Sequence, residues 1–312
     1  MNWKASGELL KEAGNGWLDD KVPRMSAALA YYTILSVAPL LVLALGIAGR
    51  FFDPHQVQEA IVTQLGGLVG PEGAQVIKTM IEHASNPGSS VTAIIVGGVI
   101  LLFGASGVFA ELQDGLNTVW EVQPKPGRPV LTILRERFLS FAMVLGTCFL
   151  LLVSLVVSAV LTALTAAVGL GHGGVVGQVL SFCISFVVIA LLFAMIFKVL
   201  PDVKIAWGDV WIGAVATALL FTLGKFLIGL YLGKASVGSA YGAAGSLVVF
   251  VVWVYYSAQI LYFGAEFTKA YANHYGSHIR PAENAVPLTD AARAQQGIPK
   301  SNTAAQPAPA GR

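Results

Sequence analysis

The clearest chemical pattern in the sequence is a line of polar side chains in an apolar segment near the C-terminal end. Tyr255, Gln259, Tyr262 and Glu266 are spaced four, three and four residues apart, which places them on one face of an α-helix. No Asp, Glu, Lys or Arg occurs between residues 235 and 265. Polar groups inside an apolar helix are costly unless they face protein or water, so this stripe predicts a surface that binds a solute or a lipid headgroup.

Other apolar segments carry two further polar stripes. Glu111 and Asp114 share a helical face, and Tyr32 and Ser36 lie one turn apart. Pro39 follows them, removes a backbone donor and predicts a hinge. The stripes together predict one polar cavity, lined by Tyr32, Ser36, Glu111, Asp114, Tyr255, Gln259, Tyr262 and Glu266. Alternatively, the acids pair with nearby bases such as Lys269, and the other polar groups only bridge helices.

Signatures of catalysis and of metal binding are missing from the sequence. The five histidines are scattered, and the two cysteines, Cys148 and Cys183, lie inside apolar runs without neighbouring ligands. Gly224-Lys225 is followed by Phe226 where a phosphate-binding loop needs Ser or Thr. We therefore expect no catalytic residues, no metal, no cofactor and no nucleic-acid partner, and we predict that the protein is not an enzyme.

Composition indicates that these stripes are positioned by membrane helices. Of 312 residues, 55% are hydrophobic and only 12% are charged, whereas about a quarter are charged in an ordinary soluble domain. Apolar runs of 18 or more residues are typical of helices that cross a bilayer. The predicted fold is all-α and polytopic, with six transmembrane helices over residues 25–51, 91–116, 138–168, 175–199, 207–232 and 244–268.

The distribution of basic residues predicts the orientation of these helices. If the N-terminus is inside, fifteen Lys and Arg residues lie on the inner side and only Arg50, Lys78 and Lys234 on the outer side. Cytoplasmic loops of membrane proteins carry an excess of Lys and Arg. Both termini are therefore predicted to be cytoplasmic, and the three polar stripes then lie toward the cytoplasmic half of the membrane.

The six spans belong to a six-helix domain of residues 25–270, which includes an outer cap, and the remaining segments lie outside the spans. Residues 1–24 form an amphipathic N-terminal segment, in which Trp3, Leu10, Ala13 and Trp17 predict a helix on the inner membrane surface. Residues 53–90 predict two short helices that form an outer cap. The segment 271–312 is rich in Pro, Ala, Gln and Asn and has no periodic apolar face, so it predicts a disordered cytoplasmic tail.

Three runs resemble the YihY/BrkB family of bacterial inner-membrane proteins. They are residues 27–41, residues 112–120, and residues 245–267 with the segment Trp253-Val254-Tyr255-Tyr256-Ser257-Ala258-Gln259. The likeness covers roughly residues 10–275 and implies a six-helix inner-membrane protein. The family was formerly mislabelled as ribonuclease BN. That label does not fit this sequence, which lacks the His-x-His-x-Asp-His cluster of such a nuclease.

Together these observations predict a multi-pass protein of the bacterial inner membrane. We expect it to transport a lipid or a small polar solute through a cytoplasm-facing polar cavity, with membrane lipids as its partners. The resemblance favours this role, since the family is associated with lipid or lipopolysaccharide export. The alternative is a non-catalytic scaffold or assembly factor for cell-envelope machinery, which would act through the outer cap and the N-terminal helix.

Overall fold

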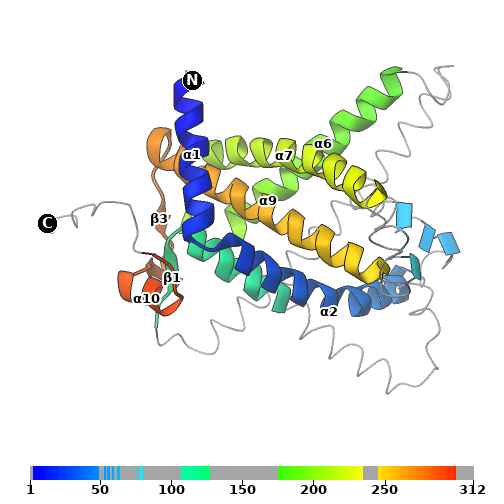
Figure 1. Ribbon diagram of the computed structural model, residues 1–312, viewed down its shortest axis with the longest axis horizontal. Coiled ribbons are helices and arrows are strands. Elements are labelled where there is room, and N and C mark those ends of the chain that lie inside the picture. Colours follow the sequence, from blue (N-terminus) through cyan, green and yellow to red (C-terminus); the bar gives the residue numbers. More distant parts are fainter. Residues whose placement is uncertain are drawn as a thin grey trace, which may run out of the picture.

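The computed structural model describes residues 3–48, 107–126, 175–234 and 245–299, together with single residues between 53 and 79. Long helices dominate these ranges (Figure 1). The helices are α2 (Val22–Ala48), α6 (Val175–Val199), α7 (Trp207–Lys234), α9 (Gly245–Tyr275) and a shorter helix over residues 107–119. Of these, α6, α7 and α9 are long and apolar enough to cross a membrane.

Within the described ranges, helices lie at the predicted spans, although α9 extends beyond its predicted end and only three of the helices are long and apolar enough to cross a membrane. α2, α6, α7 and α9 coincide with four of the six predicted spans, and the helix over residues 107–119 contains the end of a fifth. The predicted span 138–168 lies outside the described residues. So does the predicted outer cap over 53–90, apart from single residues.

A separate helix, α1 (Trp3–Asp19), lies across the bundle rather than along it (Figure 1). It packs on α9, and its buried residues are Leu9 and Ala13. Leu10 and Leu18 are exposed on its other side. A helix therefore lies in the predicted N-terminal segment, but Leu9 rather than Leu10 is the leucine that it buries, and its position on the inner membrane surface stays a prediction.

α9 is the central helix of the described bundle, because it packs against α1, α2 and α7. Its contact with α7 is built from two glycines and two threonines. A Cβ atom at Gly264 would collide with Thr217, and a Cβ atom at Gly213 would collide with Thr268. Each threonine hydroxyl donates a hydrogen bond within its own helix, Thr217 to the Gly213 carbonyl at 2.7 Å and Thr268 to the Gly264 carbonyl at 2.6 Å. Small residues of this kind let helices approach closely in a membrane.

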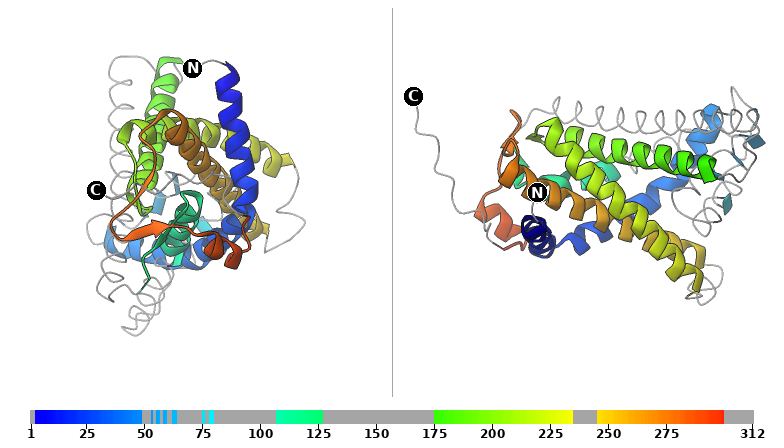
Figure 2. Two further views of the ribbon diagram at one scale, coloured as in Figure 1. Left: turned by 90° about the vertical axis from the view of Figure 1, so that its left-hand side faces the viewer. Right: turned by 90° about the horizontal axis from the view of Figure 1, so that it is seen from above.

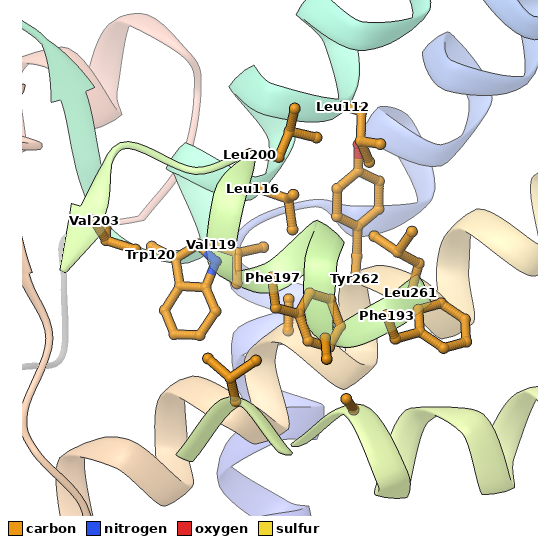
Figure 3. Packing of buried hydrophobic residues seen from close by; sticks show 14 of the residues in the cluster. Leu112, Leu116, Val119, Trp120, Phe193, Phe197, Leu200, Val203, Leu261 and Tyr262 are labelled. Atoms are coloured by element: carbon orange, nitrogen blue, oxygen red, sulfur yellow. The ribbon is translucent and has the colours of Figure 1, made fainter. Parts of the chain in front are cut away.

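Among the described residues, the main apolar core lies where α2 and the helix over residues 107–119 meet α6, α7 and α9. Figure 3 shows Leu116, Val119 and Trp120 from that helix and its following turn, close to Phe197 of α6. The ring of Tyr262 on α9 points toward Leu112 (Figure 3). Since Tyr262 and Phe197 are both fully buried, this core fixes the end of α9 against the rest of the bundle.

Short strands and a short helix form an end cap at the same end of the bundle as α1 (Figures 1 and 2). Strand β1 (Val122–Pro124) pairs antiparallel with β4 (Ala285–Pro287), in the register Val122 to Pro287. Strand β2 (Val203–Lys204) pairs antiparallel with β3 (Arg280–Pro281). Helix α10 (Asp290–Gln295) follows and is capped by Thr289, whose side chain accepts a hydrogen bond from the Ala292 amide.

The prediction of a disordered tail from residue 271 is wrong for residues 271–299. α9 continues to Tyr275, and β3, β4 and α10 follow it. The segment is ordered without a periodic apolar face, because strand pairing and a few buried residues hold it in place. These buried residues include Ala285, Leu288, Arg293 and Ile298. Residues 300–312 lie outside the described residues.

Candidate functional site

Five charged side chains meet where α1, α9 and the end cap come together. We call them the charge cluster: Asp20, Glu121, Glu266, Lys269 and Arg293. Lys269 Nζ lies 2.9 Å from Glu266 Oε2, 3.7 Å from Glu121 Oε1 and 3.9 Å from Asp20 Oδ2. Arg293 Nη2 lies 2.8 Å from Asp20 Oδ1, and Arg293 Nη1 lies 3.8 Å from Glu121 Oε1. The cluster therefore joins α10 to α9 and to the start of α2.

Two sharp turns place the acids of the charge cluster. Asp20 lies between α1 and α2, and the next residue, Lys21, has a positive φ of 53°. Glu121 lies in the turn after the helix over residues 107–119 and has a positive φ of 57°. Such backbone is uncommon for residues other than glycine and persists only where the surroundings hold it. Here the ion pairs supply that constraint, together with the bond that the Leu288 amide donates to the Glu121 carbonyl at 2.8 Å.

A second buried polar group fixes the turn between α6 and β2. Asn117 donates to Asp202 Oδ2 at 3.0 Å and accepts from the Asp202 amide at 2.8 Å. Asn284 donates to Asp202 Oδ1 at 2.9 Å. Asp209 at the start of α7 accepts from both the amide and the hydroxyl of Ser277. Because buried polar groups need such partners, these contacts hold the end cap onto the bundle.

The exposed acid of the end cap behaves differently from these buried groups. Lys204 Nζ lies 3.0 Å from Glu283 Oε1 at the surface. The hydrogen bond from Lys204 lowers the pKa of the Glu283 carboxyl. Since the side chain is 92% exposed, water screens this pair and it contributes little to stability.

The predicted stripe on α9 contacts a different neighbour at each of its positions. Tyr255 packs against the apolar cluster of α2 and α9 that contains Ala30, whereas the Tyr262 hydroxyl lies 3.5 Å from the Glu111 carbonyl oxygen. Glu266 fills the space above Gly16 of α1, where a Cβ atom would lie 2.5 Å from Glu266 Oε2. The stripe therefore follows one helical face, but three different helices cover it.

The other predicted site residues lie on α2 and on the helix over residues 107–119. Ser36 is buried and donates to the Tyr32 carbonyl at 2.7 Å, and the Tyr32 ring covers Gly107. α2 continues as a helix through Pro39, the predicted hinge. Glu111 is half-buried and Asp114 is exposed. Tyr32 and Glu111 thus lie on two helices that contact each other at Gly107.

An open groove of about 290 Å³ lies between α1, α7 and α9. Its walls are mostly apolar, and Gln259 is the predicted site residue that lines it. The lining residues are Trp17, Leu220, Leu223, Gly224, Leu227, Tyr256, Gln259, Ile260 and Phe263. Leu223 and Leu227 are 56% and 49% exposed, so the groove opens sideways onto the outer face of α7.

The structure thus separates residues that the sequence grouped together. Gln259 lines the groove, whereas Tyr262 and Glu266 lie in close packing and in an ion pair. The alternative interpretation, in which an acid pairs with a nearby base, is confirmed for Glu266 and Lys269. Within the described ranges, no group of three His, Cys, Asp or Glu side chains is arranged to hold a metal ion.

Sequence reasoning missed most of the charge cluster. Lys269 could be found, because it lies three residues after Glu266 and therefore on the same helical face. Asp20 and Glu121 lie just outside apolar segments, and nothing in their spacing indicates a partner. Arg293 gave no signal, because its partner Asp20 lies 273 residues away in a segment with no common pattern.

Comparison with known proteins agrees with a membrane location. The family model described as Virulence factor BrkB matches residues 13–289. A UPF0761 membrane protein of Pseudomonas aeruginosa (strain LESB58) is 26% identical over 259 residues, 83% of this chain and 61% of that protein. One from Vibrio vulnificus (strain CMCP6) is 26% identical over 286 residues, 91% of this chain and 85% of that protein.

The chain therefore spans about three fifths of the length of the Pseudomonas relatives that it matches. No solved structure shows significant similarity to it. The match to the family model covers most of the sequence, and it includes α1 from residue 13 onward, α2, the charge cluster except Arg293, and the groove. The chain belongs to the Virulence factor BrkB family.

Proposed function

We propose that this chain is a multi-pass protein of the bacterial inner membrane that translocates a lipid or a small polar solute. Six transmembrane helices with both termini in the cytoplasm are part of the proposal. Three apolar helices, relatives named as membrane proteins, and the excess of basic residues on one predicted side support this placement. Of the two classes of substrate, the groove favours a lipid.

The groove between α1, α7 and α9 is the observation that carries the proposal. Its leucines lie on an exposed face of the apolar helix α7. In a bilayer this face would contact the hydrocarbon chains of lipids. Ligand sites combine apolar walls with a few placed polar groups, and Gln259 supplies such a group near the middle of α9. An acyl chain fits these walls, and a polar atom of the same lipid can bond to the amide.

Purified full-length chain in phospholipid vesicles tests this proposal. A fluorescent phospholipid in both leaflets is quenched from outside, and the rate at which inner label becomes accessible is measured. We expect the chain to speed this rate above that of protein-free vesicles. Equal rates would contradict the proposal, and they are what the scaffold alternative predicts.

Gln259→Leu should slow translocation about fivefold, because it removes one hydrogen bond worth about 1 kcal/mol at the groove. The vesicle assay measures this change, and the amount of folded protein in the vesicles is measured alongside. Ser257→Ala is the matched control, since it removes a polar group two residues earlier on a different face of α9. A Gln259→Leu rate equal to that of Ser257→Ala would exclude Gln259 from the transport path.

A further inference from the structure

Aromatic side chains mark both ends of the exposed face of α7. Trp207 and Trp211 are 51% and 40% exposed at the start of the helix, and Tyr231 is 60% exposed near its end. Among the described residues between Trp211 and Tyr231, each exposed side chain belongs to Leu, Ile, Val or Phe, and Lys225 is half-buried. Trp and Tyr are enriched at the two interfaces between a membrane and water. The pattern is therefore that of a helix face in contact with lipid.

The separation of these aromatic side chains matches the thickness of one bilayer. Trp211 and Tyr231 are about 20 residues apart, which is about 30 Å along a helix at 1.5 Å per residue. The hydrocarbon core of a bilayer is also about 30 Å thick. At the other side of Trp211, Lys198 Nζ lies 5.6 Å from the centre of the Trp207 ring, and such pairs of Lys and Trp suit the headgroup layer. The midpoint of this stretch of α7 falls at Phe221.

The close contacts between α7 and α9 show which residue of α9 lies level with this midpoint. Gly213 meets Thr268, and one turn further along α7 Thr217 meets Gly264. The two helices are therefore antiparallel, and each turn forward on α7 corresponds to one turn back on α9. One more turn in the same direction brings the midpoint of α7 level with Ile260.

The groove lies at this level. Ile260 and its neighbour Gln259 both line it, and its walls on α7 extend from Leu220 to Leu227. A Cβ atom at Gly224 would lie 2.6 Å from Ile260 Cδ1, which agrees with the register of the two helices. The amide of Gln259 is therefore near the middle of the stretch that the aromatic side chains delimit.

We infer that the groove opens into the middle of the bilayer and holds the ends of lipid acyl chains, a placement that rests on the proposed function, in which α7 crosses the membrane. The headgroup of a resting phospholipid lies about 15 Å away from this level, at the membrane surface. The exposed face of α7 contacts acyl chains from Trp211 to Tyr231. Gln259 therefore meets a headgroup only while a lipid crosses from one leaflet to the other.

This depth gives Gln259 a specific part in translocation. A polar headgroup in hydrocarbon has lost its hydration, so the free energy of a crossing lipid is highest near the middle of the bilayer. The Gln259 amide donates and accepts hydrogen bonds at a level where acyl chains offer none. An interaction that is made only at the top of a barrier speeds the crossing and does not tighten the binding of the resting lipid.

Spin labels along the exposed face of α7 measure this depth in phospholipid vesicles. Single cysteines in the full chain, with Cys148→Ser and Cys183→Ser, each carry a nitroxide. The labelled positions are Ile212, Leu219, Leu223 and Leu230, all of them exposed. Collisions with oxygen, which concentrates in the middle of a bilayer, are compared with collisions with a water-soluble nickel complex. The control is a label at Lys204, which is exposed in the end cap and should collide mainly with nickel.

We expect the ratio of oxygen to nickel collisions to be highest at Leu219 and Leu223 and several times lower at Ile212 and Leu230. A ratio that rises or falls steadily along α7 would place the midpoint elsewhere and overturn the inference. Few collisions with either reagent at all four positions would show that another helix or a second copy of the chain covers this face, which would also overturn it.

Two photoactivatable phospholipids test what the groove holds in the wild-type chain. One carries a diazirine at the end of an acyl chain, and the other carries it beside the glycerol. We expect the first to label the stretch from Leu220 to Leu227 and to label Gln259→Leu equally well, whereas the second should not label it. Stronger labelling by the second probe would overturn the inference. Translocation is measured separately, so a chain that transports lipid without these depth results would contradict the inference and leave the proposed function standing.

Discussion

Arg293→Ala is expected to destabilise the full chain by about 3–5 kcal/mol, the range found when one partner of a buried ion pair is removed. The variant leaves Asp20 buried without its 2.8 Å partner, at a position where the carboxylate is only 2% exposed. It also leaves the charge cluster with three acids and one base. The free energy of unfolding in mild detergent is the measurement.

The control for this substitution is Arg280→Ala, which removes an exposed arginine of the same end cap. Surface changes of this kind usually stay within about 0.5 kcal/mol. The double variant Asp20→Ala with Arg293→Ala should lose less than the sum of the two single variants, because the pair disappears as a unit. Strict additivity, or equal effects at Arg293 and Arg280, would show that the ion pair does not hold the end cap.

Gly264→Ala should destabilise the bundle by about 1–3 kcal/mol, because it adds a methyl group where α7 and α9 are in close contact. Thr217 occupies the space that the new Cβ atom would need, and its hydroxyl is committed to the Gly213 carbonyl. The backbone of one helix would have to shift to admit the methyl group. The measurement is again the free energy of unfolding in mild detergent.

A compensating variant, Thr217→Gly, and a control variant, Gly208→Ala, test the close contact at Gly264. Thr217→Gly removes the obstructing side chain, so it should recover part of the stability lost in Gly264→Ala. Gly208→Ala adds the same methyl group to the first turn of α7, where nothing lies within 4 Å of the new atom. It should be neutral or stabilising by up to about 1 kcal/mol. Equal losses at Gly264 and Gly208 would rule out the close contact.

The helices could be predicted from the sequence because each one is determined by the residues of its own segment. Each of α6, α7 and α9 coincides with an apolar run that is long enough to span a membrane. The predicted and observed boundaries of these helices therefore agree within a few residues, except at the end of α9. α9 continues past the apolar run to Tyr275, since Lys269 and Glu266 remain inside the protein rather than at a membrane boundary. The length of an apolar run does not indicate that charged residues near its end form an ion pair inside the protein.

The end cap could not be predicted, because it is held by contacts with residues that lie far away in the sequence. Arg293 lies in a run of Ala and Gln with no apolar period, and only the position of Asp20 makes it a buried residue. The polar stripe on α9 shows that a pattern within one helix does not reveal which other helix covers it. Helical spacing gave the shared face of Gln259 and Glu266, but it did not show that α1 crosses that face and covers Glu266.

The proposed transport requires a lipid to move along the groove between α1, α7 and α9. This movement can be tested by measuring vesicle translocation by Leu223→Trp and comparing it with Leu219→Trp. Both leucines are exposed on α7, at 56% and 59%, but only Leu223 lines the groove. We expect Leu223→Trp to fill the groove and slow translocation to the rate of protein-free vesicles, whereas Leu219→Trp should keep the wild-type rate. Equal, wild-type rates for both variants would contradict it.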